Sequence, residues 1–194
     1  MERTYMSREE AYKILNEYIK NQNLIKHHLA CEAVMKALYK RLNKNQSPEE
    51  QEKWGMVGLL HDADYELTKD TPEKHAIVLG ELIGDKLPPD VMHAIGSHNW
   101  ARNGVEPKKL MDWSIYCCDE LTGLIVAAAL IHPDKKLSPL TVDFIMNRFN
   151  EKSFARGADR EMIKMSEEKL GIELREFVEL SLKAMQDIHA TLGL

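Results

Sequence analysis

The sequence predicts an all-α protein. Apolar residues recur at helical spacing, capping residues or prolines open most of these segments, and no stretch alternates apolar and polar residues over the length of a strand. The chain has 194 residues, of which 44 % are hydrophobic and 29 % charged, which is enough for a substantial core. No linker or internal repeat interrupts the pattern, so we expect residues 1–194 to form a single domain.

Helix-start signals mark the first five predicted helices. Ser7 begins a capping box, Asn23 can cap the second helix, and Ser47 is followed by a proline at the first helical position. Pro72 and Pro89 give the same proline entry to the next two helices. The predicted helices of this half are 7–20, 24–43, 48–61, 72–84 and 89–98.

The second half continues the helical pattern. Its predicted helices are 107–131, 139–149, 160–170 and 173–191. Asp159 is a candidate N-cap, and Gly171 suits the position just after a helix. Gly55, Gly58 and Gly80 lie inside helical patterns, where small residues allow helices to cross closely.

Composition argues against several classes of protein. The formal net charge is −5, so the chain lacks the basic footprint of a nucleic-acid polymer binder. Three cysteines, two of them adjacent at Cys117 and Cys118, argue against a disulfide framework and indicate a reducing compartment. The N-terminus has no signal pattern, and the longest apolar run, 124–131, is short for a bilayer. We expect a cytoplasmic protein without a membrane partner.

Histidines fall on the apolar faces of several predicted helices. On a helical wheel His27 lies near the centre of an apolar stripe, and His28 lies at the edge of that stripe. His75 and His98 each share a face with aliphatic residues, and His61 ends its helix in line with apolar positions. For any one of them, a hydrogen-bonded core position is the ordinary alternative to a functional role.

Asp119 changes the interpretation of this set because it lies on a helix that is apolar nearly all round. A buried carboxylate without a partner is very costly. One divalent ion, or a pair of ions, would satisfy the aspartate and the histidines together, and imidazole and carboxylate are ligands of transition metals. The cysteines lack the spacing of a structural zinc site. The predicted ligands are His27, His61, Asp62, His75, His98 and Asp119.

The order of these residues resembles the HD superfamily of metal-dependent phosphohydrolases. A histidine lies early in one helix (Ile25-Lys-His-His-Leu-Ala-Cys-Glu-Ala), a His-Asp pair follows (Gly58-Leu-Leu-His-Asp-Ala-Asp-Tyr), and an aspartate lies in a later helix (Cys118-Asp-Glu-Leu-Thr-Gly). The resemblance covers roughly residues 20–131, the expected HD core. Residues 132–194 are expected to pack on it as a helical extension, and are similar to those of a group of bacterial and archaeal HD hydrolases.

Two features separate the chain from particular branches of this superfamily. His75 and His98 resemble the two additional ligands of the dinuclear branches, but the gap between Asp62 and His75 is short. A position for His75 behind the ligands or facing the substrate therefore stays open. The Gly-Tyr-Pro signature of the cyclic-dinucleotide phosphodiesterases is absent.

The resemblance implies hydrolysis of a phosphomonoester, phosphodiester or phosphoanhydride, with a small nucleotide as the expected substrate. The cofactor would be one or two divalent ions of Mn, Fe, Co, Ni or Zn, with Mg as a further candidate. Asp62, Asp64 and His75 are the candidate catalytic residues; Asp64 would orient a ligand imidazole or act as a base on water, and a role as a loop cap is its alternative.

Binding of the substrate phosphate requires cations. Lys69 and Arg156 are the expected substrate-binding residues, and each could instead be a solvated surface charge. The further candidates, open to the same alternative, are Arg102, Arg148, Lys152 and Arg160. Two other interpretations stay open. The chain could be a non-catalytic regulatory module that binds metal and nucleotide, or a structural protein whose polar core is hydrogen-bonded. A homodimer is among the expected assemblies.

Overall fold

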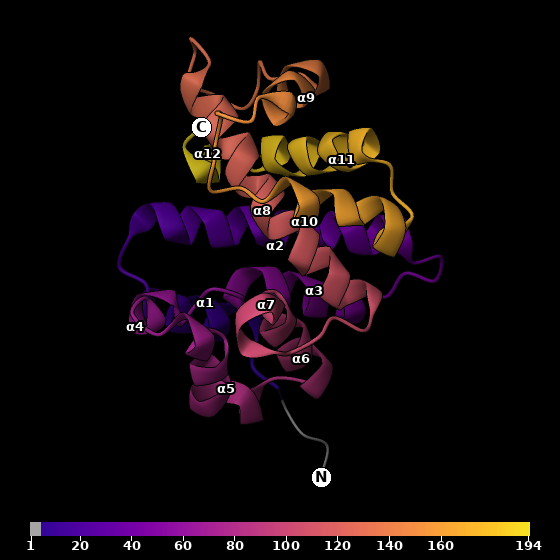
Figure 1. The fold of residues 1–194 in the computed structure, drawn as a ribbon. Helices are drawn as coiled ribbons and strands as arrows, with labels where there is room; N and C mark the ends of the chain where they lie inside the picture. The colour runs from indigo at the N-terminus through magenta and orange to yellow at the C-terminus, as the bar shows by residue number, and fades with distance from the viewer. Residues whose placement is uncertain (1–4) are drawn as a thin grey trace.

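The computed structural model of the chain describes residues 5–194, and these residues form helices and turns without strands, which confirms the all-α prediction. The first four residues, where no signal pattern was found, lie outside this range. Two long helices, α2 (Gln22–Leu42) and α8 (Leu110–Ile131), pack against each other and cross in the middle of the molecule (Figure 1). Most of the other helices are grouped on two sides of α2 (Figure 1).

The first half of the chain forms the layer below α2 in Figure 1. Its helices are α1 (Arg8–Tyr18), α3 (Pro48–Leu60), α4 (Tyr65–Thr68), α5 (Ile77–Ile83), α6 (Pro89–Ser97) and α7 (Trp100–Asn103). The predicted capping box at Ser7 and the cap at Ser47 are both confirmed. The predicted cap of the second helix is wrong: Asn21 caps it, because its side chain accepts the Asn23 N–H.

The last third of the chain covers the opposite side of α2. Its helices are α9 (Val142–Asn150), α10 (Arg160–Met165), α11 (Leu174–Asp187) and α12 (His189–Leu192), and a π-helical turn, Ser166–Leu170, follows α10. Asp159 caps α10 through two backbone N–H groups, and Gly171 adopts a φ of 65° just after the π turn, as the sequence predicted. Helix α11 packs on α2 and α10 packs on α8, so this segment contacts both central helices.

Gly58 allows α2 and α3 to pack at close range. A Cβ atom at this position would lie 2.5 Å from the main-chain carbonyl carbon and oxygen of Cys31. Only glycine fits there without a shift of backbone, which confirms the predicted close crossing. One turn after Gly58 the chain reaches His61, so the crossing also brings this histidine close to α2.

The predicted helix 72–84 is wrong. A 3-10 turn, Pro72–Lys74, ends at His75 in an extended conformation, and Ala76 has a left-handed φ of 67° before α5 begins. The buried Asp64 carboxylate accepts the N–H groups of Ala76 and Leu79 at 3.1 and 2.9 Å. The first amides of a helix have no carbonyl partner within that helix. In a continuous helix the carbonyls of the preceding turn would accept them, and here the Asp64 carboxylate accepts two of them instead. This break, rather than a helical face, directs His75 into the protein.

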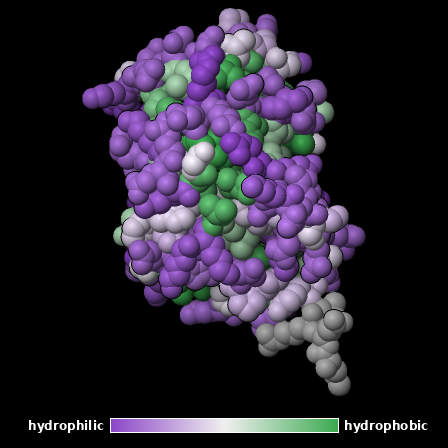
Figure 2. All heavy atoms as spheres, turned by 90° about the vertical axis from the view of Figure 1, so that its right-hand side faces the viewer, coloured by the Kyte–Doolittle hydropathy of each residue, from purple (hydrophilic) through white to green (hydrophobic). Residues whose placement is uncertain are grey.

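Helix α8 is long and apolar enough to cross a membrane by length and composition alone, but 61 % of its most apolar window is buried inside the protein. Its burial follows from its central position between the two layers. The face of the molecule in Figure 2 is largely hydrophilic, and a narrower apolar band runs through its middle.

Candidate metal centre

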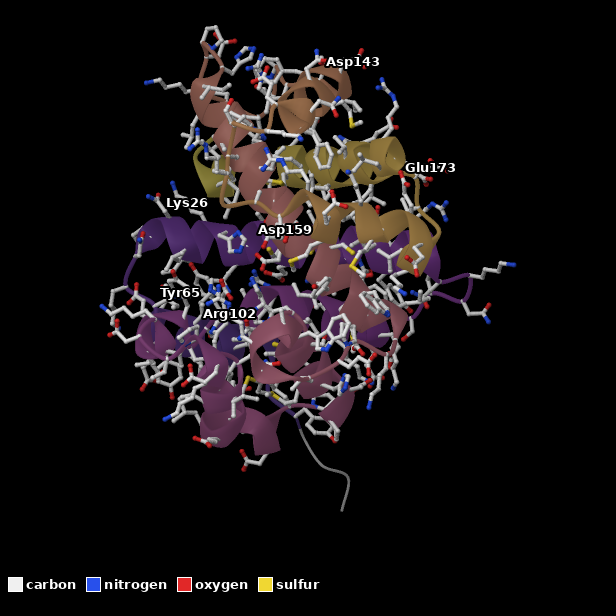
Figure 3. The ribbon with its side chains drawn as sticks, in the orientation of Figure 1. Lys26, Tyr65, Arg102, Asp143, Asp159 and Glu173 are labelled. Carbon is white, nitrogen blue, oxygen red and sulfur yellow. The ribbon has the colours of Figure 1, made fainter. Side chains whose placement is uncertain are left out.

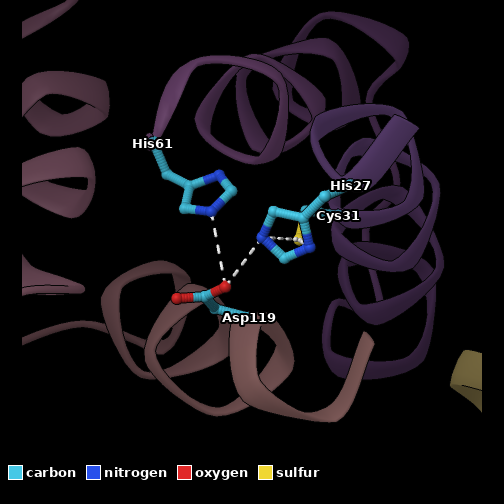
Figure 4. A group of neighbouring side chains, drawn as sticks. All are labelled: His27, Cys31, His61 and Asp119. Carbon is cyan, nitrogen blue, oxygen red and sulfur yellow. Dashed lines mark hydrogen bonds and ion pairs between the residues drawn. The ribbon is translucent and has the colours of Figure 1, made fainter. Parts of the chain in front are cut away.

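The first group of polar side chains joins α2, the end of α3 and the middle of α8. His27 Nε2 lies 2.9 Å from Asp119 Oδ1, and His61 Nε2 lies 3.5 Å from the same oxygen (Figure 4). Asp62 Oδ2 lies 3.8 Å from His61 Nε2. Of the two adjacent histidines in α2, the structure therefore brings His27 to the aspartate.

The second group is built on the other oxygen of Asp62. His75 Nε2 and His98 Nε2 lie 2.7 and 3.0 Å from Asp62 Oδ1, and 3.0 Å from each other. His98 caps the C-terminal end of α6, and His75 occupies the break before α5. Asp62 thus has one carboxylate oxygen close to each group. Each group could hold a metal ion, and together the two groups contain all six ligands that the sequence predicts.

In two of the histidines a main-chain carbonyl determines which ring nitrogen carries the proton. His61 Nδ1 lies 3.0 Å from Gly58 O, and His98 Nδ1 lies 2.5 Å from Ile95 O. A carbonyl oxygen accepts only, so in each ring we assign the proton to Nδ1 from this partner. The Nε2 atoms then carry lone pairs, and these lone pairs point toward the carboxylates.

Asp64 fixes the third ring. Its Oδ1 lies 2.8 Å from His75 Nδ1, and Thr68 Oγ1 lies 3.2 Å from the same nitrogen. The Asp64 side chain is fully buried and also holds two N–H groups at the start of α5. Of the two roles left open by the sequence, this geometry matches orientation of a ligand imidazole. A carboxylate without solvent exposure does not reach water in the cleft, so the role of a base does not fit.

Thr122 orients the fourth ring, His27. Its hydroxyl donates to the Asp119 main-chain oxygen at 2.8 Å and can then accept from His27 Nδ1 at 3.3 Å. Cys31 Sγ lies 3.7 and 4.0 Å from the two ring nitrogens of His27, so it lies beside the ring and along neither lone pair. This places Cys31 as a packing partner of His27 rather than as a metal ligand.

The lone pairs and carboxylate oxygens of these residues are arranged as the ligands of a divalent cation would be. With all four Nδ1 atoms bonded elsewhere, four Nε2 lone pairs face the oxygens of two carboxylates, an arrangement that is repulsive unless a cation lies between them. His61 Nε2 is buried and has no hydrogen-bond partner. Imidazole nitrogen and carboxylate oxygen at these separations suit first-row transition metals.

The pKa directions agree with a site arranged for positive charge. Burial alone would raise the pKa of Asp62, but His61, His75 and His98 hold it well below its usual range. Burial likewise lowers the pKa of His75, yet its hydrogen bonds with Asp62 and Asp64 outweigh this and raise the pKa to about 10. The carboxylates are therefore ionised, and without a metal His75 carries the proton that pairs with them.

An open cleft of about 550 Å³ lies over both groups. Ligand candidates that line it are Asp62, His75, His98 and Asp119. Its walls come from α4, α7, α8 and the start of α10 and carry Tyr65, Lys69, Arg102, Glu120 and Asp159. Figure 3 shows Tyr65, Arg102 and Asp159 around this region.

Of the two cations expected to bind substrate, only Lys69 lines the cleft. Arg156 is exposed and does not belong to the lining, because the turn that carries it brings Gly157 and Asp159 to the cleft instead. Arg102 is the second cation of the wall. Neither Lys69 nor Arg102 forms an ion pair with any residue in the described range 5–194, so both are available to an anion.

Sequence reasoning missed several residues that shape the site. The threonines that orient His75 and His27 carry no motif, although Thr122 follows Asp119 at helical spacing. His28, placed at the edge of the stripe by the wheel, is fully buried, and neither ring nitrogen has a partner. Burial lowers the pKa of His28 well below its usual range, so this ring is neutral.

Comparison of the chain with protein-family models, curated proteins and solved structures gives no significant match.

Proposed function

We propose that the protein is a metal-dependent phosphohydrolase of the HD type, acting on a phosphate ester or anhydride of a small molecule, with nucleotides as the expected class. One observation carries the proposal: four histidine Nε2 atoms from separate segments converge on Asp62 and Asp119 beside an open cleft. A structural core would satisfy its polar groups internally and would not need a cleft over them.

The residues divide into ligands, positioning groups and phosphate-binding groups. His27, His61 and Asp119 would hold one ion, His75 and His98 a second, and Asp62 would contact both. When bound, divalent ions would polarise a phosphoryl oxygen and activate water for attack. Mn, Fe, Co, Ni and Zn are the proposed metals, with Mg as a further candidate.

Phosphate would enter the cleft between the metal centre and the cationic wall. Lys69 and Arg102 lie on that wall, and both are exposed. Arginine can bind two phosphate oxygens at once, whereas lysine acts as a point charge. These two residues would hold the phosphate next to Asp62, where the attack on phosphorus takes place.

The proposal is tested by metal analysis and a substrate screen. Purified protein should contain a transition metal, and with Mn²⁺, Co²⁺ or Mg²⁺ it should hydrolyse an aryl phosphate or a nucleotide. Asp62→Asn should lower kcat/KM by roughly 100-fold or more, because second-layer changes alone typically cost 10–100-fold.

Asp143→Asn is the matched control, because Asp143 is an exposed carboxylate on α9, distant from the cleft in Figure 3. This variant should keep the wild-type rate. Protein that neither retains nor binds these metals would contradict the proposal. Metal-dependent binding of nucleotides without turnover would instead support a regulatory module.

A further inference from the structure

Charge divides the cleft into two sides. Lys69 and Arg102 supply the cations, whereas Glu120 and Asp159 supply carboxylates from α8 and the start of α10. Asp159 N–H donates to Glu120 Oε2 at 2.9 Å, which joins these two residues into one wall. A phosphate is repelled by the exposed Asp159 carboxylate and attracted to the other side, so the wall faces the remainder of the substrate.

Each carboxylate of this wall keeps one oxygen free for a ligand. Asp159 Oδ1 accepts the N–H groups of Glu161 and Met162 at the start of α10. Asp159 Oδ2 and Glu120 Oε1 accept no hydrogen bond within residues 5–194. A group packed against these oxygens that brought no donor would leave them desolvated and unpaired, at a cost in binding.

Arg160 holds the wall in place. Its guanidinium group donates to the main-chain oxygens of Ala155 and Ala158 at 2.6 and 2.7 Å, to that of Phe149 at 3.4 Å, and to that of Phe154. It also lies over the Phe149 ring. One side chain thus fixes the turn 154–159, which carries Gly157 and Asp159 to the cleft. The wall is therefore preorganised before a ligand binds.

We propose that the Glu120–Asp159 wall is the subsite for the non-phosphate part of the substrate, and that it selects a group that donates hydrogen bonds, either sugar hydroxyls or an ammonium. Arg160 is its positioning residue. The subsite rests on the proposed phosphohydrolase function, since it assumes that phosphate lies at the metal centre. It draws residues of the C-terminal segment into substrate recognition.

Two matched pairs of ligands test the subsite. A nucleoside 5′-monophosphate is compared with its 2′,3′-dideoxy analogue, and phosphoethanolamine with ethyl phosphate. Dissociation constants are measured by calorimetry with Mn²⁺ present, alongside kcat/KM. In at least one pair the donor-bearing member should be preferred by roughly 10-fold or more, because a ligand without the donor covers the carboxyl oxygens of the wall and leaves them unpaired. The pair that responds distinguishes hydroxyls from an ammonium.

Variants connect this preference to the wall. Asp159→Asn keeps a good N-cap for α10 but removes the charge, and Glu120→Gln replaces the other carboxyl group by an amide. In each the preference should fall toward equality, because one oxygen acceptor of the wall is replaced by, or can be exchanged with, an N–H donor and the strength of a carboxylate acceptor is lost. Arg160→Met should also reduce it, by freeing the turn 154–159. Loss of folded stability alone would change both members of a pair equally, so the ratio reports the wall itself. Asp143→Asn should keep the wild-type ratio.

The outcomes separate this inference from the proposed function. Equal affinity for both members of both pairs, or a preference unchanged in Asp159→Asn and Glu120→Gln, would overturn the subsite while leaving phosphate hydrolysis intact. Preferential binding that depends on the wall, without turnover of any ligand, would support the subsite and remove the hydrolase. Failure of all four ligands to bind would overturn the subsite.

Discussion

Asp64 and His75 form a buried pair in which Asp64 Oδ1 lies 2.8 Å from His75 Nδ1, on the side of the ring opposite Asp62. The same carboxylate begins α5 through two N–H groups. The Asp64 side chain therefore stabilises the interruption of the helix before α5 and also orients the His75 imidazole, which that interruption turns inward. A carboxylate behind a histidine ligand fixes its tautomer and raises its basicity.

Replacing this carboxylate should weaken the second ion site. In Asp64→Asn we expect metal affinity at the His75–His98 pair to fall about 10–100-fold, because an amide orients the ring less strongly than a carboxylate. Calorimetric titration with Mn²⁺ would separate this loss from binding at the other group. Asp134→Asn, at an exposed carboxylate, is the control. An unchanged affinity would show that Asp64 serves only the start of α5.

Stability of the metal-free protein should depend on His75. The folded-state pKa of this ring is raised from 6.5 to about 10, although burial acts against the rise, because of Asp62 and Asp64. The folded protein therefore binds this proton more tightly than the unfolded chain does. The resulting stabilisation is complete below pH 6.5 and is lost as the pH rises toward about 10.

Thermal unfolding with a chelator, followed across this pH range, measures the effect. Wild-type protein should lose stability relative to His75→Asn as the pH rises. Added Mn²⁺ should stabilise the wild type more at the alkaline end, because metal competes with the proton for His75 Nε2. A constant difference between the two proteins at every pH would contradict a raised pKa.

Thr122 offers a test at the first group. Thr122→Val keeps the shape of the side chain but removes the hydroxyl that His27 Nδ1 contacts at 3.3 Å. We expect roughly 10-fold weaker metal binding at the His27–His61–Asp119 group, with the second group unaffected. Metal competition assays on the variant would measure this. Equal losses at both groups would indicate a general disturbance of the core rather than loss of orientation.

Gly58 tests the crossing that brings α2 and α3 together. A methyl group there would meet the Cys31 main chain at 2.5 Å, so Gly58→Ala should destabilise the protein by about 1–3 kcal/mol. Gly123→Ala is the matched control, since Gly123 is exposed in α8 with open space around it, and it should stabilise by about 0.5–1 kcal/mol. Denaturant unfolding of both variants measures whether the free energy of unfolding falls in Gly58→Ala and rises in Gly123→Ala. An unchanged stability of Gly58→Ala would mean that α2 and α3 can move apart at this crossing without cost.

Periodicity predicted most of the helices and the inward direction of the ligand residues, because burial of an apolar stripe forces whatever shares that stripe to face the core. It gave the wrong reason for His75. The wheel put His75 on one face with Val78, Leu79 and Leu82. Leu79 is buried but Leu82 is 43 % exposed, and the break at Ala76 is what turns the ring inward. Periodicity describes a continuous helix, and it does not register a tertiary contact from Asp64 that ends one.

The sequence by itself determined the helical class and the identity of the six side chains that could hold metal, since both follow from residue types and their spacing. The tertiary structure alone decided how those side chains are divided between two groups, which threonine or carboxylate orients each ring, and that Arg102 rather than Arg156 lines the cleft. The physical reason is distance along the chain: His27 and Thr122 are 95 residues apart, and only packing of α2 on α8 brings such pairs into contact.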